Sequence, residues 1–333
     1  MILGIETTAH TFGIGIADKG RILANVRDTY TTEKGGIIPI EAARHHRQVA
    51  ERLYKGALAK AGISEKEIKA IALANAPGLA PCLIAGMNFA KELATRLEVK
   101  IIPVNHCLAH LEIARITGAK DPVLLYASGA NTQIIAYAGG KYRVFGETLD
   151  IGIGNCIDTF ARYAGFGFPG GPKIAKLAEE IEKLSDKEEH YIELPYTIKG
   201  MDIAFSGILT NLRQKLESKK YKIGDLAFSL QETIFPMLVE ASERAMAHTG
   251  KIELALGGGV ACNKRLQEMC AIMCAERGAK FFCPANEFLV DNGAMIAYTG
   301  EIILNADKNV GIKCSDIDIK PRQRTDEVEV GWR

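Results

Sequence analysis

The sequence predicts an α/β protein made of two similar lobes with a ligand cleft between them. Its main support is a duplicated order of elements: strand, hydroxyl-rich turn, strand, second turn, strand. Each copy is followed by helical segments and further apolar strands, which favours sheets covered by helices. With 333 residues, 47% of them hydrophobic, the chain can bury one large or two medium cores.

The first copy lies at the N-terminus. Apolar segments at residues 2–6, 12–17 and 22–27 are separated by turns at residues 7–10 and 18–20. Short apolar segments bounded by such turns are typical of strands, so a three-stranded meander is predicted.

The second copy begins about a third of the way along the chain. Strands are predicted at residues 123–127, 132–137 and 142–149, with turns at residues 128–131 and 139–140. The order matches that of the first copy, which indicates a duplicated lobe.

Helices and further strands follow each copy. Helical patterns occur at residues 40–61, 156–164 and 172–183, and strand-like segments at residues 71–75 and 252–256. The division predicted from this order is an N-terminal lobe at residues 1–121, a C-terminal lobe at 122–315, and a charged tail or linker at 316–333.

Composition narrows the functional class. A net charge of +1 gives no overall electrostatic footprint for nucleic acid, so RNA contact would need a local patch or a partner. No apolar run approaches the roughly 20 residues that span a bilayer, and no secretion signal is evident, so we expect a cytoplasmic protein without membrane contact. The eight cysteines lack paired spacing, which favours reduced thiols, most of them in the core.

Two histidines, His106 and His110, stand four residues apart on a predicted amphipathic helix. They therefore project from the same face one turn apart, as two ligands of one metal would. The helix lies between strand-like segments at residues 100–104 and 123–127, where α/β sheets usually bind ligands. A solvated surface pair is the alternative.

Glycine-rich turns follow several strands and could bring backbone close to a ligand. They are Ser128-Gly129-Ala130-Asn131, Phe168-Pro169-Gly170-Gly171-Pro172-Lys173, and Gly257-Gly258-Gly259, which leads to Asn263 and a helix from Lys264. None matches a P-loop or a dinucleotide fingerprint. Each alone could be an ordinary turn.

The sequence alone does not fix the roles of two carboxylates, Asp291 and Asp158. Asp291 follows the apolar residues 288–290 at a predicted strand-to-helix junction, where it could cap the helix. Asp158 stands four residues before Arg162 and could form a surface ion pair.

Taken together, these motifs resemble the universal tRNA threonylcarbamoyltransferase family over residues 1 to about 315. Ala130-Asn131 resembles the archaeal and eukaryotic branch, the catalytic subunits of KEOPS complexes. The resemblance implies the actin and sugar-kinase (ribonuclease H-like) fold. It is carried by Ile5-Glu6-Thr7-Thr8, Asn105-His106 with His110, Tyr126-x-Ser128-Gly129-Ala130-Asn131-Thr132, the Phe168 to Pro172 loop, Phe205-Ser206-Gly207, the Gly257 to Asn263 segment, and Asp291-Asn292-Gly293.

The resemblance also implies a site. One divalent metal per subunit, iron or zinc, would be held by His106, His110, Tyr126 and Asp291. An adenine nucleotide, as part of the donor, would lie on Tyr126, Ala127, Ser128, Gly129, Ala130 and Asn131, with Asp158 and Gly171 near the ribose and Asn263 near the base. Where many relatives carry a glutamate, this chain has Ala175, so that contact is missing or comes from another residue such as Glu179.

The implied reaction moves a threonylcarbamoyl group from threonylcarbamoyl-AMP to the exocyclic amine of the adenosine beside the anticodon, in tRNAs that read codons beginning with A. The mixed anhydride is activated, so positioning and charge stabilisation would suffice without a covalent nucleophile. Implied partners are tRNA, a small kinase-like ATPase and KEOPS accessory subunits. Arg44, His45, His46 and Arg47 are candidate RNA-facing residues, with a solvated helix start as the alternative.

Three other classes compete with the transferase. A zinc peptidase needs a glutamate directly after the first histidine, where this chain has Cys107. A metal-dependent ATPase or kinase of the same superfamily would share the fold, but would hold magnesium through carboxylates and water. A scaffold subunit would leave the metal and nucleotide motifs without a role.

Overall fold

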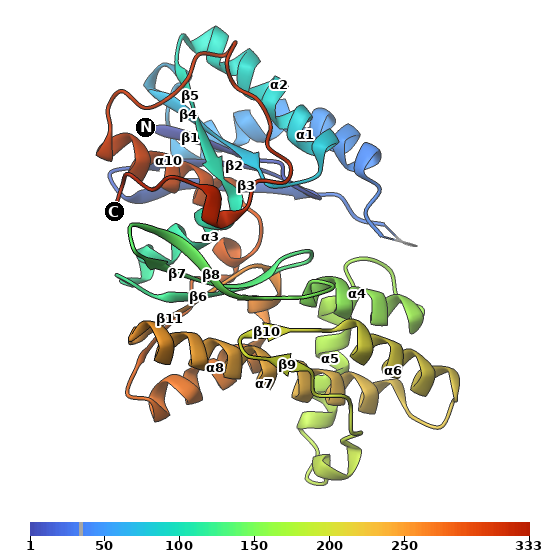
Figure 1. Cartoon of the computed structure of the whole chain (residues 1–333). Helices are drawn as coiled ribbons and strands as arrows, with labels where there is room; N and C mark the ends of the chain where they lie inside the picture. The colour runs from blue at the N-terminus through green and yellow to red at the C-terminus, as the bar shows by residue number, and fades with distance from the viewer. Residues whose placement is uncertain (33–35) are drawn as a thin grey trace.

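The computed structural model describes residues 1–32 and 36–333, which form two lobes, one above the other in Figure 1. The first lobe contains a five-stranded sheet in the order β3-β2-β1-β4-β5. Strand β1 pairs antiparallel with β2 and parallel with β4. The strands are β1 (Ile2–Glu6), β2 (Thr11–Asp18), β3 (Arg21–Thr29), β4 (Ala70–Ala76) and β5 (Lys100–Asn105).

The second lobe repeats this topology. Its sheet has the order β12-β11-β6-β7-β8, in which β6 pairs antiparallel with β7 and parallel with β11. Each strand thus has a counterpart in the first sheet, which confirms the duplicated fold. The strands are β6 (Val123–Ala127), β7 (Thr132–Ala138), β8 (Lys141–Glu147), β11 (Glu253–Gly257) and β12 (Lys280–Phe282), and a small hairpin is formed by β9 (Ile198–Lys199) and β10 (Asp202–Ile203).

Helices cover the sheets, and the helical segments predicted at residues 40–61, 156–164 and 172–183 are present as α1, α4 and α5. The prediction did not include α2, α6 or α7, and α7 is buried around most of its circumference, so it lacks a one-sided apolar stripe. The helices are α1 (Pro39–Ala61), α2 (Ala80–Leu97), α3 (His106–Ile113), α4 (Ile153–Tyr163), α5 (Gly171–Glu182), α6 (Ser206–Glu217), α7 (Ile223–Thr249), α8 (Lys264–Glu276), α9 (Asn286–Leu289) and α10 (Gly293–Ala306). In the described part of the chain, no helix is both long and apolar enough to cross a bilayer.

Helix α10 packs directly on the first sheet, backbone against backbone. A Cβ added to Gly15 would lie 2.2 Å from the Ala294 nitrogen, and one added to Gly4 would lie 2.3 Å from the Gly293 carbonyl oxygen. Only glycines permit this approach. We propose that α10 completes the first lobe, although it follows the second in the chain.

Helix α3 lies between the two sheets and is buried along its whole length. Ala109 and Ile113 pack in a cluster with Met295 of α10, whereas Leu111 packs in a cluster with Leu124 of the second sheet. The helix is therefore not the amphipathic surface element that its sequence suggested. Its histidines are core residues, which excludes a solvated surface pair.

The C-terminal segment after α10 lies against both lobes. The Lys320 amide donates to the Asn75 carbonyl oxygen (2.8 Å) in the first lobe, and Thr325 Oγ1 donates to Gln133 Oε1 (3.2 Å) in the second. Trp332 Nε1 donates to the buried carboxylate of Glu112 on α3 (2.8 Å). In this structure the segment is packed against the protein, where the sequence suggested an extended end.

Candidate functional site

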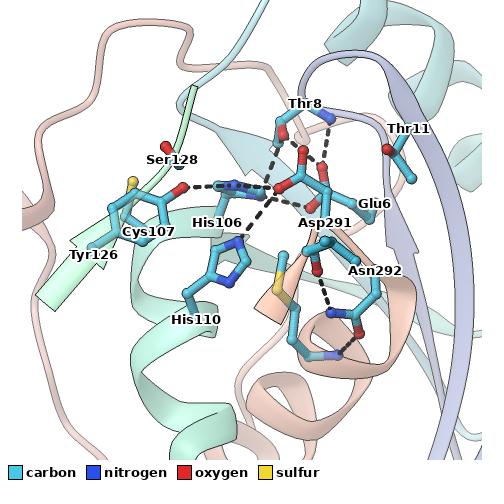
Figure 2. A network of polar contacts seen from close by, with 12 residues as sticks. Glu6, Thr8, Thr11, His106, Cys107, His110, Tyr126, Ser128, Asp291 and Asn292 are labelled. Atoms are coloured by element: carbon cyan, nitrogen blue, oxygen red, sulfur yellow. Dashed lines mark hydrogen bonds and ion pairs between the residues drawn. The ribbon is translucent and has the colours of Figure 1, made fainter. Parts of the chain in front are cut away.

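Three potential metal ligands meet where α3 approaches the N-terminus of α10 (Figure 2). Nε2 of His106 and Nε2 of His110 each lie 3.4 Å from the same Asp291 oxygen, Oδ1. Ligand atoms of all three residues lie within 4.8 Å of one another. The hydroxyl of Tyr126, at the end of β6, is 3.1 Å from His106 Nε2. The two lobes thus contribute to one cluster.

The cluster suits a small divalent metal. Two ligands held about 2.1 Å from a tetrahedral ion lie roughly 3.4 Å apart, close to the spacing of each histidine from Asp291. Both ring nitrogens of His110 are buried without a hydrogen-bond partner among the described residues. Buried polar atoms are normally satisfied, so an ion between these side chains would account for His110 Nε2. Nitrogen and oxygen ligands without a thiolate fit zinc or iron.

Glu6 fixes the orientation of His106. Its Oε2 lies 2.8 Å from His106 Nδ1, while its Oε1 accepts hydrogen bonds from the amide and the hydroxyl of Thr8, both at 2.6 Å. A carboxylate on Nδ1 leaves Nε2 directed at the cluster, as in carboxylate–histidine–metal arrangements. Sequence reasoning assigned Glu6 no role. The available indication was a carboxylate ending a fully buried strand.

The charges of the cluster are strongly coupled. Burial lowers the pKa of His106, but the carboxylates of Glu6 and Asp291 outweigh it and raise that pKa to about 9. Burial opposes ionisation of Asp291, yet His106 and His110 hold the pKa of Asp291 below its usual range. Burial raises the pKa of the Tyr126 phenol well above its usual value and that of the Cys107 thiol to about 12, so both stay protonated without an ion.

Asp291 does not cap the following helix. The side chain of Asn292 accepts the hydrogen bond from the Met295 amide (2.9 Å) and forms the cap of α10. The apolar residues before Asp291 form the short helix α9, so the predicted strand-to-helix junction is wrong. Because Asn292 supplies the cap, the Asp291 carboxylate is free to face the histidines.

The loop after β6 forms an exposed ledge beside this cluster. The Ser128 amide and hydroxyl both donate to the Asn131 carbonyl oxygen at 2.9 Å, which closes the turn. Carbonyl oxygens of Ser128 and Gly129 accept the first amides of α4, from Gly154 and Asn155. Gly129 has open space above it, since an added Cβ would contact only Asn155 Oδ1, at 3.7 Å. A ligand can therefore approach this backbone closely.

Asp158 supports a second loop. Its Oδ1 accepts hydrogen bonds from the amides of Gly170 (2.8 Å) and Gly171 (3.1 Å). The sequence alternative paired Asp158 with Arg162, but the carboxylate engages this backbone, while Arg162 donates to Thr159 Oγ1 (3.4 Å). A Cβ on Gly171 would meet nothing within 4 Å, so this glycine too is open to a ligand.

The three-glycine segment after β11 is less open than expected. Gly258 has a φ of +90° and packs on the end of β6, where an added Cβ would lie 2.3 Å from the Ala127 carbonyl oxygen. Asn263 begins α8, as its side-chain oxygen accepts from the Arg265 amide (2.9 Å) and its nitrogen donates to Gln231 (2.9 Å). Both ends of this amide therefore have protein partners.

Four residues proposed for RNA contact divide into two groups. His46 is buried, with Nε2 3.0 Å from the Ala9 carbonyl oxygen, and burial lowers its pKa to about 4. His45 Nε2 lies 2.9 Å from Asp28 Oδ1. The prediction is therefore wrong for the buried His46, whereas the half-buried His45 is held by Asp28. Arg44 and Arg47 are exposed.

The position of Ala175 lies on α5, one turn after Gly171. Glu179, the suggested substitute for a missing carboxylate, is exposed and pairs with Lys183 at 2.8 Å. We therefore find no structural support for a ribose contact by Glu179.

Comparison with known proteins gives the family of this chain. Residues 21–298 match the family model of tRNA N6-adenosine threonylcarbamoyltransferase. A protein of that name from Thermococcus kodakarensis is 56% identical over 99% of both chains, and one from Thermofilum pendens is 48% identical over 100% of this chain and 97% of the relative. A probable bifunctional tRNA threonylcarbamoyladenosine biosynthesis protein of Methanosarcina mazei is 49% identical over 99% of this chain, which spans 59% of that longer protein.

Solved structures agree on the fold. HypF from T. kodakarensis covers 91% of this chain with a TM-score of 0.63 at 14% identity, and the match spans 47% of HypF. Component A of the Acidaminococcus fermentans (R)-2-hydroxyglutaryl-CoA dehydratase matches over 90% of this chain and 97% of its own, with a TM-score of 0.53 and 14% identity. The fold is that of actin and the sugar kinases. By its family model and its relatives at 48–56% identity, the chain belongs to the tRNA N6-adenosine threonylcarbamoyltransferase family.

Proposed function

We propose that this chain transfers the threonylcarbamoyl group of threonylcarbamoyl-AMP to the exocyclic amine of the adenosine beside the anticodon. The acceptors would be tRNAs that read codons beginning with A. The observation that carries the proposal is the convergence of two histidines, Asp291 and Tyr126 next to the open Ser128–Asn131 ledge, within a chain of this family.

The chemistry asks for alignment more than for a nucleophilic side chain. The amine nitrogen forms a bond to the carbamoyl carbon, the bond from that carbon to the AMP oxygen breaks, and the amine loses a proton. Because AMP is a good leaving group, holding the donor and the acceptor in line supplies a large part of the reduction in activation free energy. His106, His110, Tyr126 and Asp291 would hold a divalent metal, iron or zinc, which supplies positive charge for the donor's anionic oxygens.

The donor's nucleotide would lie along the ledge and reach the second loop. Residues 126–131 offer open backbone at Gly129, and the loop supported by Asp158 offers open backbone at Gly171. Since the Asn263 amide is already engaged, a base contact there would have to share its hydrogen bonds. Asn155, exposed beside Gly129, is a further polar group that sequence reasoning missed.

A valine at Gly129 should weaken nucleotide binding. Its φ is in the ordinary range and its Cβ has room in the free protein, so the fold should be retained while the ligand's path is blocked. We expect the affinity for AMP, measured by calorimetry, to fall at least about tenfold, or about 1.4 kcal/mol. Gly56→Val on the exposed face of α1 is the control, because nothing lies within 4 Å of that position either. Equal affinities in the two variants would place the nucleotide elsewhere.

Removing the charge of Glu6 should weaken the metal site without touching a ligand. Glu6→Gln keeps the size of the side chain but replaces the carboxylate that binds His106 Nδ1 with a neutral and weaker acceptor, so metal affinity should fall about 10- to 100-fold. Competition with a chelator measures this. Glu112→Gln is the matched control, since Glu112 is an equally buried carboxylate on α3 itself, bound by Tyr142 and Trp332. A parallel loss in both variants would indicate general destabilisation.

The proposed function includes partner proteins. The bifunctional relatives are longer than this chain, which supports cooperation with a further module, here a small kinase-like ATPase together with KEOPS accessory subunits. The setting would be the cytoplasm, where tRNA is present.

The decisive experiment supplies the metal-loaded protein and its partners with separately prepared threonylcarbamoyl-AMP and unmodified tRNA. We expect threonylcarbamoyladenosine in the tRNA by nucleoside mass spectrometry, with one AMP released per modified adenosine. If no modified nucleoside forms, and this chain without its partners hydrolyses ATP in a separate reaction, the metal-dependent ATPase or kinase alternative would be supported instead.

A further inference from the structure

The turn after β1 connects the candidate metal centre with the second lobe. Glu6 at its start holds His106, and the Thr8 amide donates to Glu6. Two residues later, the ring of His10 meets the ring of Phe168 edge to face, with centroids 5.3 Å apart and planes at 81°. The Phe168 amide donates to the Thr32 carbonyl oxygen (3.2 Å). Two half-buried aromatic rings, one from each lobe, therefore stand side by side.

His10 has unused hydrogen-bonding capacity. Its Nδ1 is buried and has no partner among the residues that the structure describes. An unsatisfied buried nitrogen is unfavourable, and the contact with Phe168 does not satisfy it. A ligand that is both flat and rich in donors and acceptors would cover the exposed parts of the two rings and bring polar groups close to this nitrogen. A nucleobase has these properties.

His10 also lies between the two halves of the proposed site. Burial raises the pKa of Asp158, and the charge of His10 is among the influences that oppose this rise. The same histidine acts on Asp291, whose pKa reflects burial and the nearby imidazoles. The ring is thus within electrostatic reach of the metal centre on one side and of the loop that Asp158 supports on the other.

Two cations come from the helices on either side of the Phe168 loop, Arg162 from α4 and Lys173 from α5. Lys173 lies over the ring of Phe166, with its Nζ 5.7 Å from the ring centroid. Arg162 is exposed and lies close to Gly36 of the first lobe, since a Cβ added to Gly36 would be 3.7 Å from Arg162 Nη1. Aromatic rings bordered by Lys and Arg are typical of surfaces that bind single-stranded nucleic acid, where bases stack and cations meet phosphates.

Building on the proposed function, we propose that His10 and Phe168 receive the base of the acceptor adenosine. The base would leave the anticodon loop and stack on the Phe168 ring, with the half-buried His10 ring beside its polar edge. Its exocyclic amine would then lie between the metal centre and the nucleotide ledge, where the donor carbonyl is expected. His10 and Phe168 are positioning residues in this account.

The test places 2-aminopurine at the acceptor position of an anticodon stem-loop, because stacking quenches its fluorescence. The protein and its partners should quench the probe, and Phe168→Tyr, which keeps the ring, should do the same. Phe168→Leu keeps apolar volume but removes the ring, so quenching should be lost and the KM for tRNA should rise at least about tenfold. His10→Ala should raise that KM as well. Metal content and AMP affinity should be unchanged in the two Phe168 variants.

Three outcomes overturn the inference. One is normal quenching and tRNA KM in Phe168→Leu. Another is an equal loss of tRNA and AMP binding in that variant, which would make the pair a structural contact between lobes. The third is failure of Phe168→Tyr to restore binding. Failure of the proposed function is distinguishable, since the unaltered protein with donor and tRNA would then yield no threonylcarbamoyladenosine.

Discussion

Replacing both His106 and His110 by alanine should remove stoichiometric metal from the purified protein. These two buried side chains supply two of the three nitrogen and carboxylate ligands that converge within 4.8 Å. Asp291 and the protonated Tyr126 alone would be a weak site for zinc or iron, which favour imidazole. Elemental analysis should show occupancy near one ion per chain in the unaltered protein and near zero in the double variant.

The control variant also replaces two histidines, but at positions outside the metal cluster. His45 and His190 pair with Asp28 and Asp225 at 2.9 and 2.8 Å, away from the cluster. A His45→Asn, His190→Asn variant should keep its metal. His110→Asn offers a milder change in case the double variant is unstable, and circular dichroism should show that the folded state is retained. Full occupancy in a folded double variant would refute the ligand assignment.

The fold was predictable because its evidence is local and repeated. Strands β1 to β3 and β6 to β8 each form a meander of short apolar segments and turns, and neighbouring segments pair. The place of α10 was not predictable in the same way. Its contact with the first sheet depends on Gly4, Gly15 and Gly293. Gly293 is far from the other two in sequence, so their shared packing role is evident only in the folded structure.

The same distinction applies to the site. His106 and His110 are one helical turn apart, so their spacing alone indicated a shared ligand. Tyr126 and Asp291 come from other elements, and family resemblance was needed to join them. Glu6 was missed because a single carboxylate at a strand end has no periodic pattern, although it controls which nitrogen of His106 faces the cluster.

Local polar patterns were the least informative. The histidine pair at positions 45 and 46 looked exposed and basic, but helix α1 turns His46 into the protein. Asp291 was a candidate helix cap because aspartate is common at N-cap positions, but the neighbouring Asn292 caps α10. In both cases the role depended on a shift of one residue in the sequence. On a helix such a shift turns the side chain by about 100°, and in a turn it passes the cap to the neighbouring residue.

Changing Asp291 to asparagine should abolish transfer while leaving the fold intact. The substitution keeps the volume of the side chain, and the α10 cap belongs to Asn292, so the helix start should persist. It removes the negative charge that lies 3.4 Å from Nε2 of His106 and from Nε2 of His110. With the metal lost or misplaced, charge developing on the donor is no longer stabilised, and the rate should fall at least about 100-fold.

The two products should disappear together. Release of AMP and formation of threonylcarbamoyladenosine follow from cleavage of one bond, so Asp291→Asn should lower both in the same ratio. Glu287→Gln, on the exposed face of the adjacent helix α9, should leave both unchanged. If Asp291→Asn still released AMP at the full rate but no longer modified tRNA, the carboxylate would serve acceptor placement and not the donor, because hydrolysis of the donor would then proceed without it. If both products formed at normal rates, Asp291 would have no part in the reaction.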